Sequence, residues 1–182
     1  MSTYISLLRG INVSGQKLIK MDDLRKCFEN LGFQDVRTHV QTGNVVFESE
    51  ETDIVKIEEN ITRRIEHEFG FIVPVIAMTP EKLKHIIEYN PFLKDTEKDQ
   101  NYFHITFLSS IPENYDPRLF TDKKLAGEEI VFNGNAAYLY CPNGYGRTKL
   151  TNNFLETKLK VGATTRNWKT TNILLKMAEK TI

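Results

Sequence analysis

The sequence predicts an α+β protein made of two ferredoxin-like units of the βαββαβ type, each an antiparallel sheet with helices on one face. Three observations support this prediction. Residues 1–78 read as strand, helix, strand, strand, helix and strand, which is the ferredoxin-like order. Residues 79–182 repeat most of that order and end in a further helix. Hydrophobic residues make up 40% of the 182-residue chain, enough for the cores of two small units packed together.

The first unit shows the clearest periodicity of the chain. Ile57, Ile61 and Ile65 recur at the spacing that places side chains on one helix face. Gly70 ends that helix, and Pro74 marks the next strand as an edge strand or a bent one. The predicted elements of the unit are a strand over 3–8, a helix over 21–31, strands over 35–40 and 44–47, a helix over 54–69 and a strand over 71–78.

The second unit begins with a helix for which Thr79 is the N-cap and Pro80 the first residue. Residues 109–129 hold two prolines and many charges, which predicts a long loop with a helical turn near 118–125. One strand of the ferredoxin-like order has no clear counterpart, and residues 71–78 fit either unit. The other predicted elements are a strand over 102–108, a hairpin over 130–140, a helix over 150–159 and a last helix from residue 168.

The charge of the chain is balanced overall but unevenly distributed. Lysine plus arginine and aspartate plus glutamate each total 24, so the formal net charge is zero. Proteins that coat nucleic acids are usually basic, so this balance argues against that class. Acidic residues predominate over residues 48–68, and basic residues predominate over residues 144–182. The basic segment keeps nucleic-acid binding as an alternative function, and solvated helix faces are the simpler explanation of both segments.

The cysteines and the N-terminus predict a cytoplasmic protein. Cys27 and Cys141 are far apart and show no CxxC spacing, so we expect reduced thiols. The chain begins directly with a strand-like pattern and lacks the basic and apolar regions of a signal peptide. No apolar run approaches the length that spans a membrane, so we expect no membrane partner.

No complete catalytic motif is present. There is no GxSxG motif and no selectable Ser-His-Asp set, so whether the protein is an enzyme stays open. Asp22, Asp23 and His39 are equally eligible as a general base. We predict no metal and no cofactor, because the four histidines lack the spacing of metal ligands; they are His39, His67, His85 and His104.

A first candidate binding region follows from strand pairing. In a ferredoxin-like unit the first and third strands are antiparallel neighbours, so the end of one lies beside the start of the other. This places Arg9 and Asn12 near Gln41, Thr42 and Asn44. One cation and several amides then meet at one end of the sheet. The alternative is that the amides close the hairpin turn through their own side chains.

The stretch from Gly144 to Thr151 is a second candidate. It joins a strand to a helix, and its glycines allow successive N–H groups to point toward one anion at the helix start. Arg147 and Lys149 add positive charge. The GxxxxGK[ST] spacing of a P-loop is not met. The alternative is an ordinary strand–helix turn in which Thr148 or Thr151 caps the helix.

The third candidate is the segment from Thr164 to Trp168. Arg166 precedes a predicted helix start, where a cation is unfavourable for the helix dipole. We therefore expect an anionic partner, or a carboxylate from another element, beside it. Asn167 adds an amide, and Trp168 fits a core anchor better than a stacking platform.

Five ordered motifs resemble a widespread, mainly bacterial domain-of-unknown-function family. Its members commonly read LRGINVGG, QSGNV, GxGRSKL and TRNW at the corresponding places, and this chain departs mildly at Ser14, Thr42 and Thr148. The resemblance implies two ferredoxin-like units and supplies no activity and no catalytic residue. The motifs in this chain are Leu8–Val13, Lys20–Leu24, Val40–Val45, Gly144–Leu150 and Ala163–Trp168.

The function these observations favour is binding of a small anionic ligand, such as a nucleotide or another phosphate compound, between the two units. The alternatives are nucleic-acid binding through the basic C-terminal segment and a protein-interaction module that uses the acidic helix or an open sheet face. The oligomeric state is not predicted. The residues expected to bind the charge are Arg9, Arg147, Lys149 and Arg166, and those expected to orient the ligand are Asn12, Gln41, Asn44 and Asn167.

Overall fold

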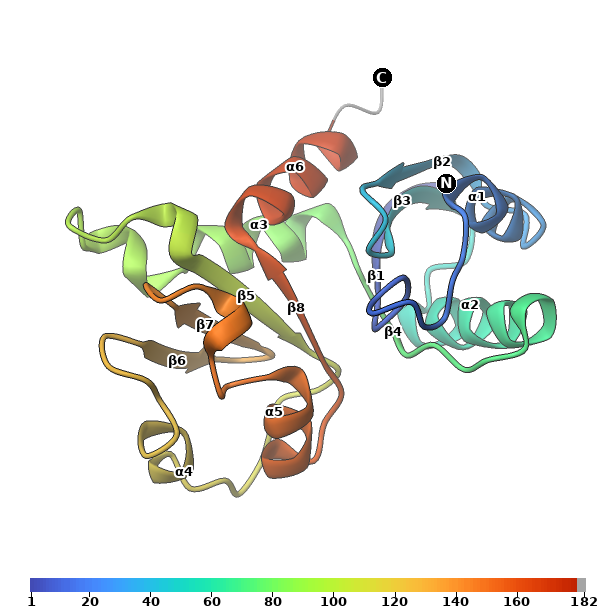
Figure 1. Cartoon of the computed structure of the whole chain (residues 1–182). Coiled ribbons are helices and arrows are strands. Elements are labelled where there is room, and N and C mark those ends of the chain that lie inside the picture. The colour runs from blue at the N-terminus through green and yellow to red at the C-terminus, as the bar shows by residue number, and fades with distance from the viewer. Residues whose placement is uncertain (180–182) are drawn as a thin grey trace. The chain divides into compact units, whose positions relative to one another are not determined.

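The computed structural model describes residues 1–179, which form two compact units (Figure 1). The first unit comprises residues 1–84 together with residues 173–179, and the second comprises residues 85–172. The sequence had suggested a division between residues 78 and 79. The contacts instead divide the chain within two helices, α3 (Pro80–Glu88) and α6 (Trp168–Glu179).

The first unit has the predicted ferredoxin-like order. Its four strands form one antiparallel sheet in the order β2-β3-β1-β4. The central pair β1 and β3 is the one expected from the sequence. The elements are β1 (Ser2–Leu8), α1 (Met21–Glu29), β2 (Gln34–His39), β3 (Asn44–Ser49), α2 (Ile54–Phe69) and β4 (Val75–Met78).

The core of the first unit lies between one face of this sheet and helices α1 and α2. Ile57, Ile61 and Ile65 form the fully buried stripe of α2, as their spacing predicted. The Asp53 side chain caps the start of α2, and Gly70 ends it in the left-handed conformation. Tyr4, Phe28, Phe33 and Phe47 contribute rings to the same core.

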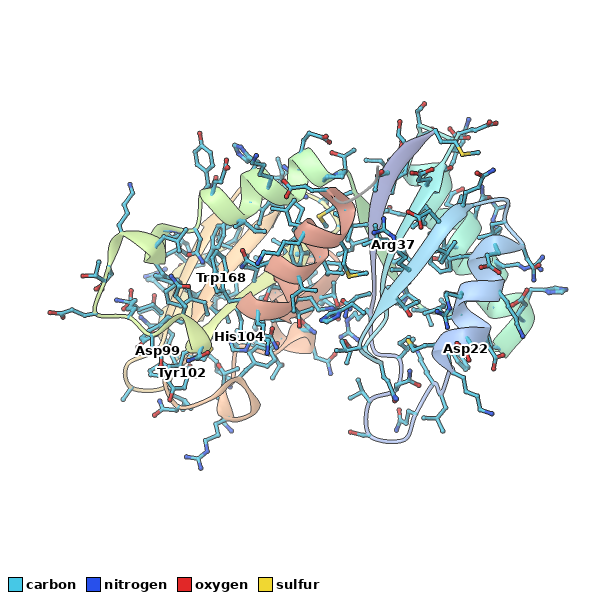
Figure 2. All side chains as sticks on the ribbon, turned by 90° about the horizontal axis from the view of Figure 1, so that it is seen from above. Asp22, Arg37, Asp99, Tyr102, His104 and Trp168 are labelled. Atoms are coloured by element: carbon cyan, nitrogen blue, oxygen red, sulfur yellow. The ribbon has the colours of Figure 1, made fainter. Side chains whose placement is uncertain are left out.

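Arg37 explains why the end of α6 groups with the first unit. Its Nη1 donates a hydrogen bond of 2.7 Å to the carbonyl of Met177, and its Nη2 forms an ion pair of 3.0 Å with Asp35 (Figure 2). A cation at the last carbonyls of a helix is favourable for the helix dipole. The last turn of α6 is therefore held by a strand of the first unit.

The second unit repeats the strand order of the first. Its sheet has the order β6-β7-β5-β8, again fully antiparallel. The elements are η1 (Pro91–Lys94), η2 (Gln100–Tyr102), β5 (Phe103–Leu108), α4 (Arg118–Thr121), β6 (Glu129–Asn133), β7 (Ala136–Tyr140), η3 (Tyr145–Arg147), α5 (Asn152–Leu159) and β8 (Ala163–Asn167).

Strand β8 is the element for which the sequence showed no clear counterpart. The sequence predicted that Thr164–Asn167 leads into the last helix, yet the whole segment Ala163–Asn167 pairs with β5. It is a short edge strand of one alanine, two threonines, an arginine and an asparagine, and its side chains change from buried to exposed along it. Such a segment lacks the apolar alternation by which a strand is recognised.

Helices cover both faces of the second sheet. Helix α5 packs on the face that includes Leu139, and α4 adds Phe120 to the same core, so the helices of the ferredoxin-like order share one face as predicted. Helix α3 lies on the other face, where the Tyr138 hydroxyl donates to the carbonyl of Ile86 at 2.7 Å. At the start of α6, Trp168 packs edge-on against a ring of β5. Helices α3 and α6 are thus additions to the ferredoxin-like order.

The two units share the same backbone hydrogen bonds at one end of their sheets. In each unit the residue that ends the first strand donates its N–H to the hairpin turn. The next residue donates to the residue that precedes the fourth strand. The bonds are Leu8 to Gly43 (2.8 Å) and Arg9 to Pro74 (2.9 Å) in the first unit, and Leu108 to Asn135 (2.9 Å) and Ser109 to Gly162 (2.9 Å) in the second.

Candidate functional site

The predicted ligand residues fall into two groups, one in each unit. Each group lies at a sheet end, but the two ends are not equivalent in the fold. The first-unit group surrounds the end of β1, and the second-unit group surrounds the ends of β7 and β8. The first group is Arg9, Asn12, Gln41 and Asn44, and the second is Arg147, Lys149, Arg166 and Asn167.

In the first unit, the two predicted motifs pack directly against each other. Leu7 pairs with Asn44 across β1 and β3, as expected from the strand order. Gly43 has a φ of +75°, and a Cβ there would lie 2.6 Å from the Cβ of Leu8 and 3.0 Å from the side chain of Ile11. Only glycine fits this position, so the first loop and the hairpin turn form one tightly packed structure.

Asn12 acts as a clamp between the first loop and the turn. Its Nδ2 donates to the carbonyls of Ile19 (2.9 Å) and Gln41 (2.8 Å), and its Oδ1 accepts the N–H of Ile19 at 2.8 Å. Asn12 itself has a φ of +55°, which asparagine tolerates better than most residues. Both polar atoms of the amide are occupied, so its main role is structural.

The hairpin turn is closed in the same way by Asn44. Its Nδ2 donates to the carbonyl of His39 (3.1 Å) and to the hydroxyl of Thr42 (3.0 Å), and the residue is fully buried. Asn12 and Asn44 therefore both play the role expected as the alternative, in which side-chain amides close the turn. Val40 in this turn has a φ of +49° although it is β-branched, a conformation that costs about 1–3 kcal/mol and is concentrated at functional sites.

A pocket of about 560 Å³ lies beside the first loop and the start of α1; we call it the α1 pocket. Asp22, which lines it, forms an ion pair with Arg25 (Figure 2). Arg9 lies at the end of β1, half-buried, and is not part of the lining. The lining residues are Asn12, Leu18, Ile19, Lys20, Met21, Asp22, Asp23, Gln41 and Phe69.

In the second unit, the connection between β7 and α5 contains the glycine-rich motif. Thr148 is buried and accepts the N–H of Leu150, and Thr151 caps α5 by accepting the N–H of Phe154. The capping role expected as an alternative is therefore real for Thr151, whereas the bond of Thr148 lies in the turn before the helix. The side chains of Arg147 and Lys149 are exposed, so capping does not account for the cations.

His104 stacks on Tyr145 beside this connection. The ring centroids are 4.8 Å apart and the rings are inclined by 21°. His104 Nδ1 lies 3.2 Å from the carbonyl oxygen of Tyr102, and because a carbonyl only accepts, the ring proton is on Nδ1. Burial lowers the pKa of His104 from its usual 6.5, so the ring is neutral at pH 7. Within residues 1–179, Nε2 has no hydrogen-bond partner. Figure 2 shows His104 and Tyr102 at the same end of this unit.

Strand β8 places the third predicted motif, Thr164–Trp168, at the same end of the second sheet as His104. Asn167 pairs with His104 across β5 and β8, and its side chain caps α6 by accepting the N–H of Thr170 at 2.8 Å. Arg166 bends back on its own strand, where Nη1 donates to the hydroxyl of Thr164 and to the carbonyl of Thr165. The residue is half-buried as a whole, but its guanidinium lies deeper. Burial lowers the pKa of Arg166 to about 10, which still leaves it charged at pH 7.

A chain of polar contacts fixes the start of α5 to this sheet. The hydroxyls of Thr106 and Thr165 lie 2.7 Å apart, and Thr165 donates to Asn152 Oδ1 at 2.6 Å. The motif before α5 and the motif on β8 are therefore neighbours in the fold. Sequence reasoning missed His104 and Asn152. The available clue was that His104 and Thr106 are polar residues on one face of an otherwise apolar strand.

The two cysteine thiols and the possible metal-ligating side chains of residues 1–179 do not form a catalytic or metal site. Cys27 and Cys141 are buried free thiols, and burial, the main cause, raises the pKa of each to about 12, so neither is a ready nucleophile. Residues 1–179 contain no group of three or more His, Cys, Asp or Glu side chains placed to hold a metal ion. In the same residues, no helix is both long enough and apolar enough to cross a bilayer.

Comparison with protein families tests the resemblance to a domain-of-unknown-function family that the motifs suggested. Residues 1–138 match the family described as protein of unknown function (DUF1697). The chain belongs to this family. The match confirms the resemblance, and the motifs at 144–150 and 163–168 lie beyond the matched residues.

A solved structure supports the fold of this DUF1697 member. The conserved bacterial protein SP0830 from Streptococcus pneumoniae is 22% identical, with 97% of this chain and 98% of that chain covered and a TM-score of 0.71. At this identity the similarity concerns the fold alone. A search of the curated proteins gave no match.

Proposed function

We propose that this DUF1697 member is a cytoplasmic protein that binds a small anionic, phosphate-containing ligand. The proposed site is the end of the second sheet where the β7–α5 connection, His104 and strand β8 meet; we call it the β7–α5 site. Arg147 and Lys149 would bind the charge, with Arg166 beside them. The first-unit residues are left out because the amides of Asn12 and Asn44 already serve the fold.

Gly146 is the observation that carries this proposal. Its φ lies outside the left-handed range, and no atom lies within 4 Å of where its Cβ would be. Neither backbone conformation nor packing therefore requires a glycine at this exposed position between Tyr145 and Arg147. A glycine without a structural reason is expected where a ligand approaches the backbone closely. A bound phosphate group would supply that reason.

His104 gives the site a pH-sensitive partner for a phosphate group. Its Nε2 is an acceptor in the neutral ring and becomes a donor when the ring is protonated. A phosphate oxygen within reach of Nε2 would stabilise the protonated ring and raise its pKa. By linkage, the contribution of His104 to binding then grows as the pH is lowered from 8 toward 6.

The test is a thermal-shift and calorimetric screen of the full chain with inorganic phosphate, pyrophosphate, AMP, ATP and sugar phosphates. A ligand at a hundred times its Kd should stabilise the fold by about 2.7 kcal/mol. The variant R147A/K149A should weaken that binding by about tenfold or more. The matched control is K94A/K158A, which removes two exposed lysines of the same unit. Absence of binding by every compound, or equal loss in both variants, would contradict the proposal.

Nucleic-acid binding through the basic C-terminal segment would use the same two cations. It predicts retention on heparin and RNA that falls steeply with salt, because phosphate contacts release counterions. A small-ligand site instead predicts saturation by a single phosphate compound in the absence of nucleic acid. A steep salt dependence without any small ligand would favour the nucleic-acid alternative.

A further inference from the structure

The α1 pocket of the first unit is separate from the β7–α5 site and carries a chemistry of its own. Its volume of about 560 Å³ lies within the range of small-molecule sites, roughly 300–1,000 Å³. Four segments contribute to it: the first loop, the first turn of α1, the hairpin turn and the end of α2. We call its buried and half-buried apolar members, Ile19, Met21 and Phe69, the floor, and its exposed polar members, Lys20, Asp22, Asp23 and Gln41, the rim. The apolar members are Leu18, Ile19, Met21 and Phe69.

The rim holds two opposite charges that do not neutralise each other. Lys20 and Asp23 are three residues apart at the start of α1, a spacing at which ion pairs commonly form. Both side chains are exposed, yet among residues 1–179 neither has an ion pair or a side-chain hydrogen bond. The neighbouring Asp22 is already paired with Arg25. The pocket therefore offers one free ammonium group and one free carboxylate.

The rim also offers uncommitted hydrogen-bonding groups. Lys20 is the N-cap residue of α1, and its side chain caps no backbone N–H, so the first N–H groups of the helix have no side-chain partner at the N-cap. The Gln41 side chain is exposed and has no hydrogen bond to any residue of the described range 1–179, whereas its backbone carbonyl accepts from Asn12. These donors lie on the same pocket as the Lys20 ammonium.

The pocket is held in shape before any ligand arrives. The Asn12 clamp joins Ile19 of the floor to Gln41 of the rim. Gly43 leaves no space between the turn and β1. Val40 remains at a φ of +49°, which persists only where the surrounding structure holds it. Preorganisation of this kind lowers the entropy that binding must offset.

We propose that the α1 pocket binds a small zwitterion with an apolar body, an amino-acid-like molecule. Its carboxylate meets Lys20 and the start of α1, its ammonium group meets Asp23, and its apolar side chain covers Met21 and Phe69. Neither a simple anion nor a simple amine uses both uncommitted charges of the rim. This proposal is independent of phosphate binding at the β7–α5 site.

The experiment uses the full chain and three probes that differ by one charged group. L-leucine carries both charges, 4-methylpentanoate lacks the ammonium group and isoamylamine lacks the carboxylate. Isothermal titration and ligand-observed NMR should show binding of leucine at least about tenfold tighter than binding of either analogue. Equal binding of leucine and one analogue, or no binding of leucine, would overturn the proposal.

Two variants locate the binding within the pocket. D23N should weaken leucine binding by about tenfold, since it removes one charged contact. E81Q is the matched control, because Glu81 is also an exposed acidic residue in the first turn of a helix, α3. R147A/K149A should leave leucine binding unchanged, which separates this result from that of the phosphate screen. Equal loss in D23N and E81Q would exclude the α1 pocket as the site.

Discussion

The two ferredoxin-like units differ most in the connection between the third strand and the helix that follows it. In the first unit, residues 50–53 join β3 to α2, three of the four are acidic, and Asp53 caps the helix. In the second, residues 141–151 join β7 to α5 and carry glycines and two exposed cations, and Thr151 caps the helix. Both connections supply a helix cap, and the second also buries Cys141, Thr148 and Leu150. Neither capping nor this burial accounts for its two exposed cations, which the proposed function assigns to binding.

The opposite end of each sheet shows the reverse contrast. The same pair of backbone hydrogen bonds occurs in both units, yet the first unit adds the Asn12 clamp and the strained turn at Val40. The second unit has a short hairpin turn over 134–135 at that place. The two units therefore share a fold but carry their longer or more constrained loops at opposite ends of the sheet. Variants at matched positions test whether these elaborations serve stability or binding.

The largest expected effect is that of Gly43→Ala. The new Cβ would lie 2.6 Å from the Cβ of Leu8, a buried atom that cannot move aside, and φ is +75°. We expect a loss of about 4 kcal/mol in the free energy of unfolding, measured by urea denaturation. Gly134→Ala is the control, because its φ is also positive but its Cβ would meet no atom within 4 Å. Equal losses in the two variants would mean that φ alone, not packing, sets the cost.

Asn12→Ala should have the next largest effect. It removes three hydrogen bonds that tie the first loop to the turn, and it places alanine at a φ of +55°. The expected loss is about 3 kcal/mol in the free energy of unfolding. Asn143→Ala, which removes one exposed amide bond to the carbonyl of Ala126, should cost about 1 kcal/mol or less. A smaller loss at residue 12 than at residue 143 would show that Asn12 is not a structural clamp.

Gly146→Ala should separate binding from stability. Its Cβ meets no atom and its φ is unexceptional, so we expect the free energy of unfolding to change by no more than about 0.5 kcal/mol. Binding of a phosphate compound should weaken by about tenfold if the ligand approaches the backbone here. Stability is measured by urea denaturation and affinity by calorimetry. Unchanged affinity would remove Gly146 from the β7–α5 site.

The smallest expected effect is the pH dependence due to His104. Its pKa in the folded protein is lowered by burial, so the unfolded chain binds more protons when the pH falls below about 6.5. The neutral ring therefore contributes stability that is fully present above that pH and is lost as the pH falls toward the lowered pKa. His104→Gln should remove this component, and His67→Gln on the exposed face of α2 is the control. Identical pH profiles of wild type and His104→Gln between pH 7.5 and 5 would contradict it.

Part of the candidate site was predictable because strand order determines which ends meet. The pairing of β1 with β3 places Asn12 beside Gln41, as expected. The role of Asn12 was not predictable, since an amide that binds a ligand and an amide that clamps a loop have the same sequence. His104 was missed because the ring it stacks on, Tyr145, is distant in sequence.

The sequence by itself determined the family of this protein, the ferredoxin-like order of the first unit and most of that of the second. Hydrophobic periodicity reports which face of each element is buried, and ordered motifs report ancestry, so neither requires coordinates. Only the tertiary structure decided which polar groups are already used by the fold and which remain available. Hydrogen bonds and burial are set by neighbours far apart along the chain, as at Asn12, Arg166 and Gly146. Whether a polar group is already used by the fold therefore separates a structural residue from a candidate ligand-binding residue.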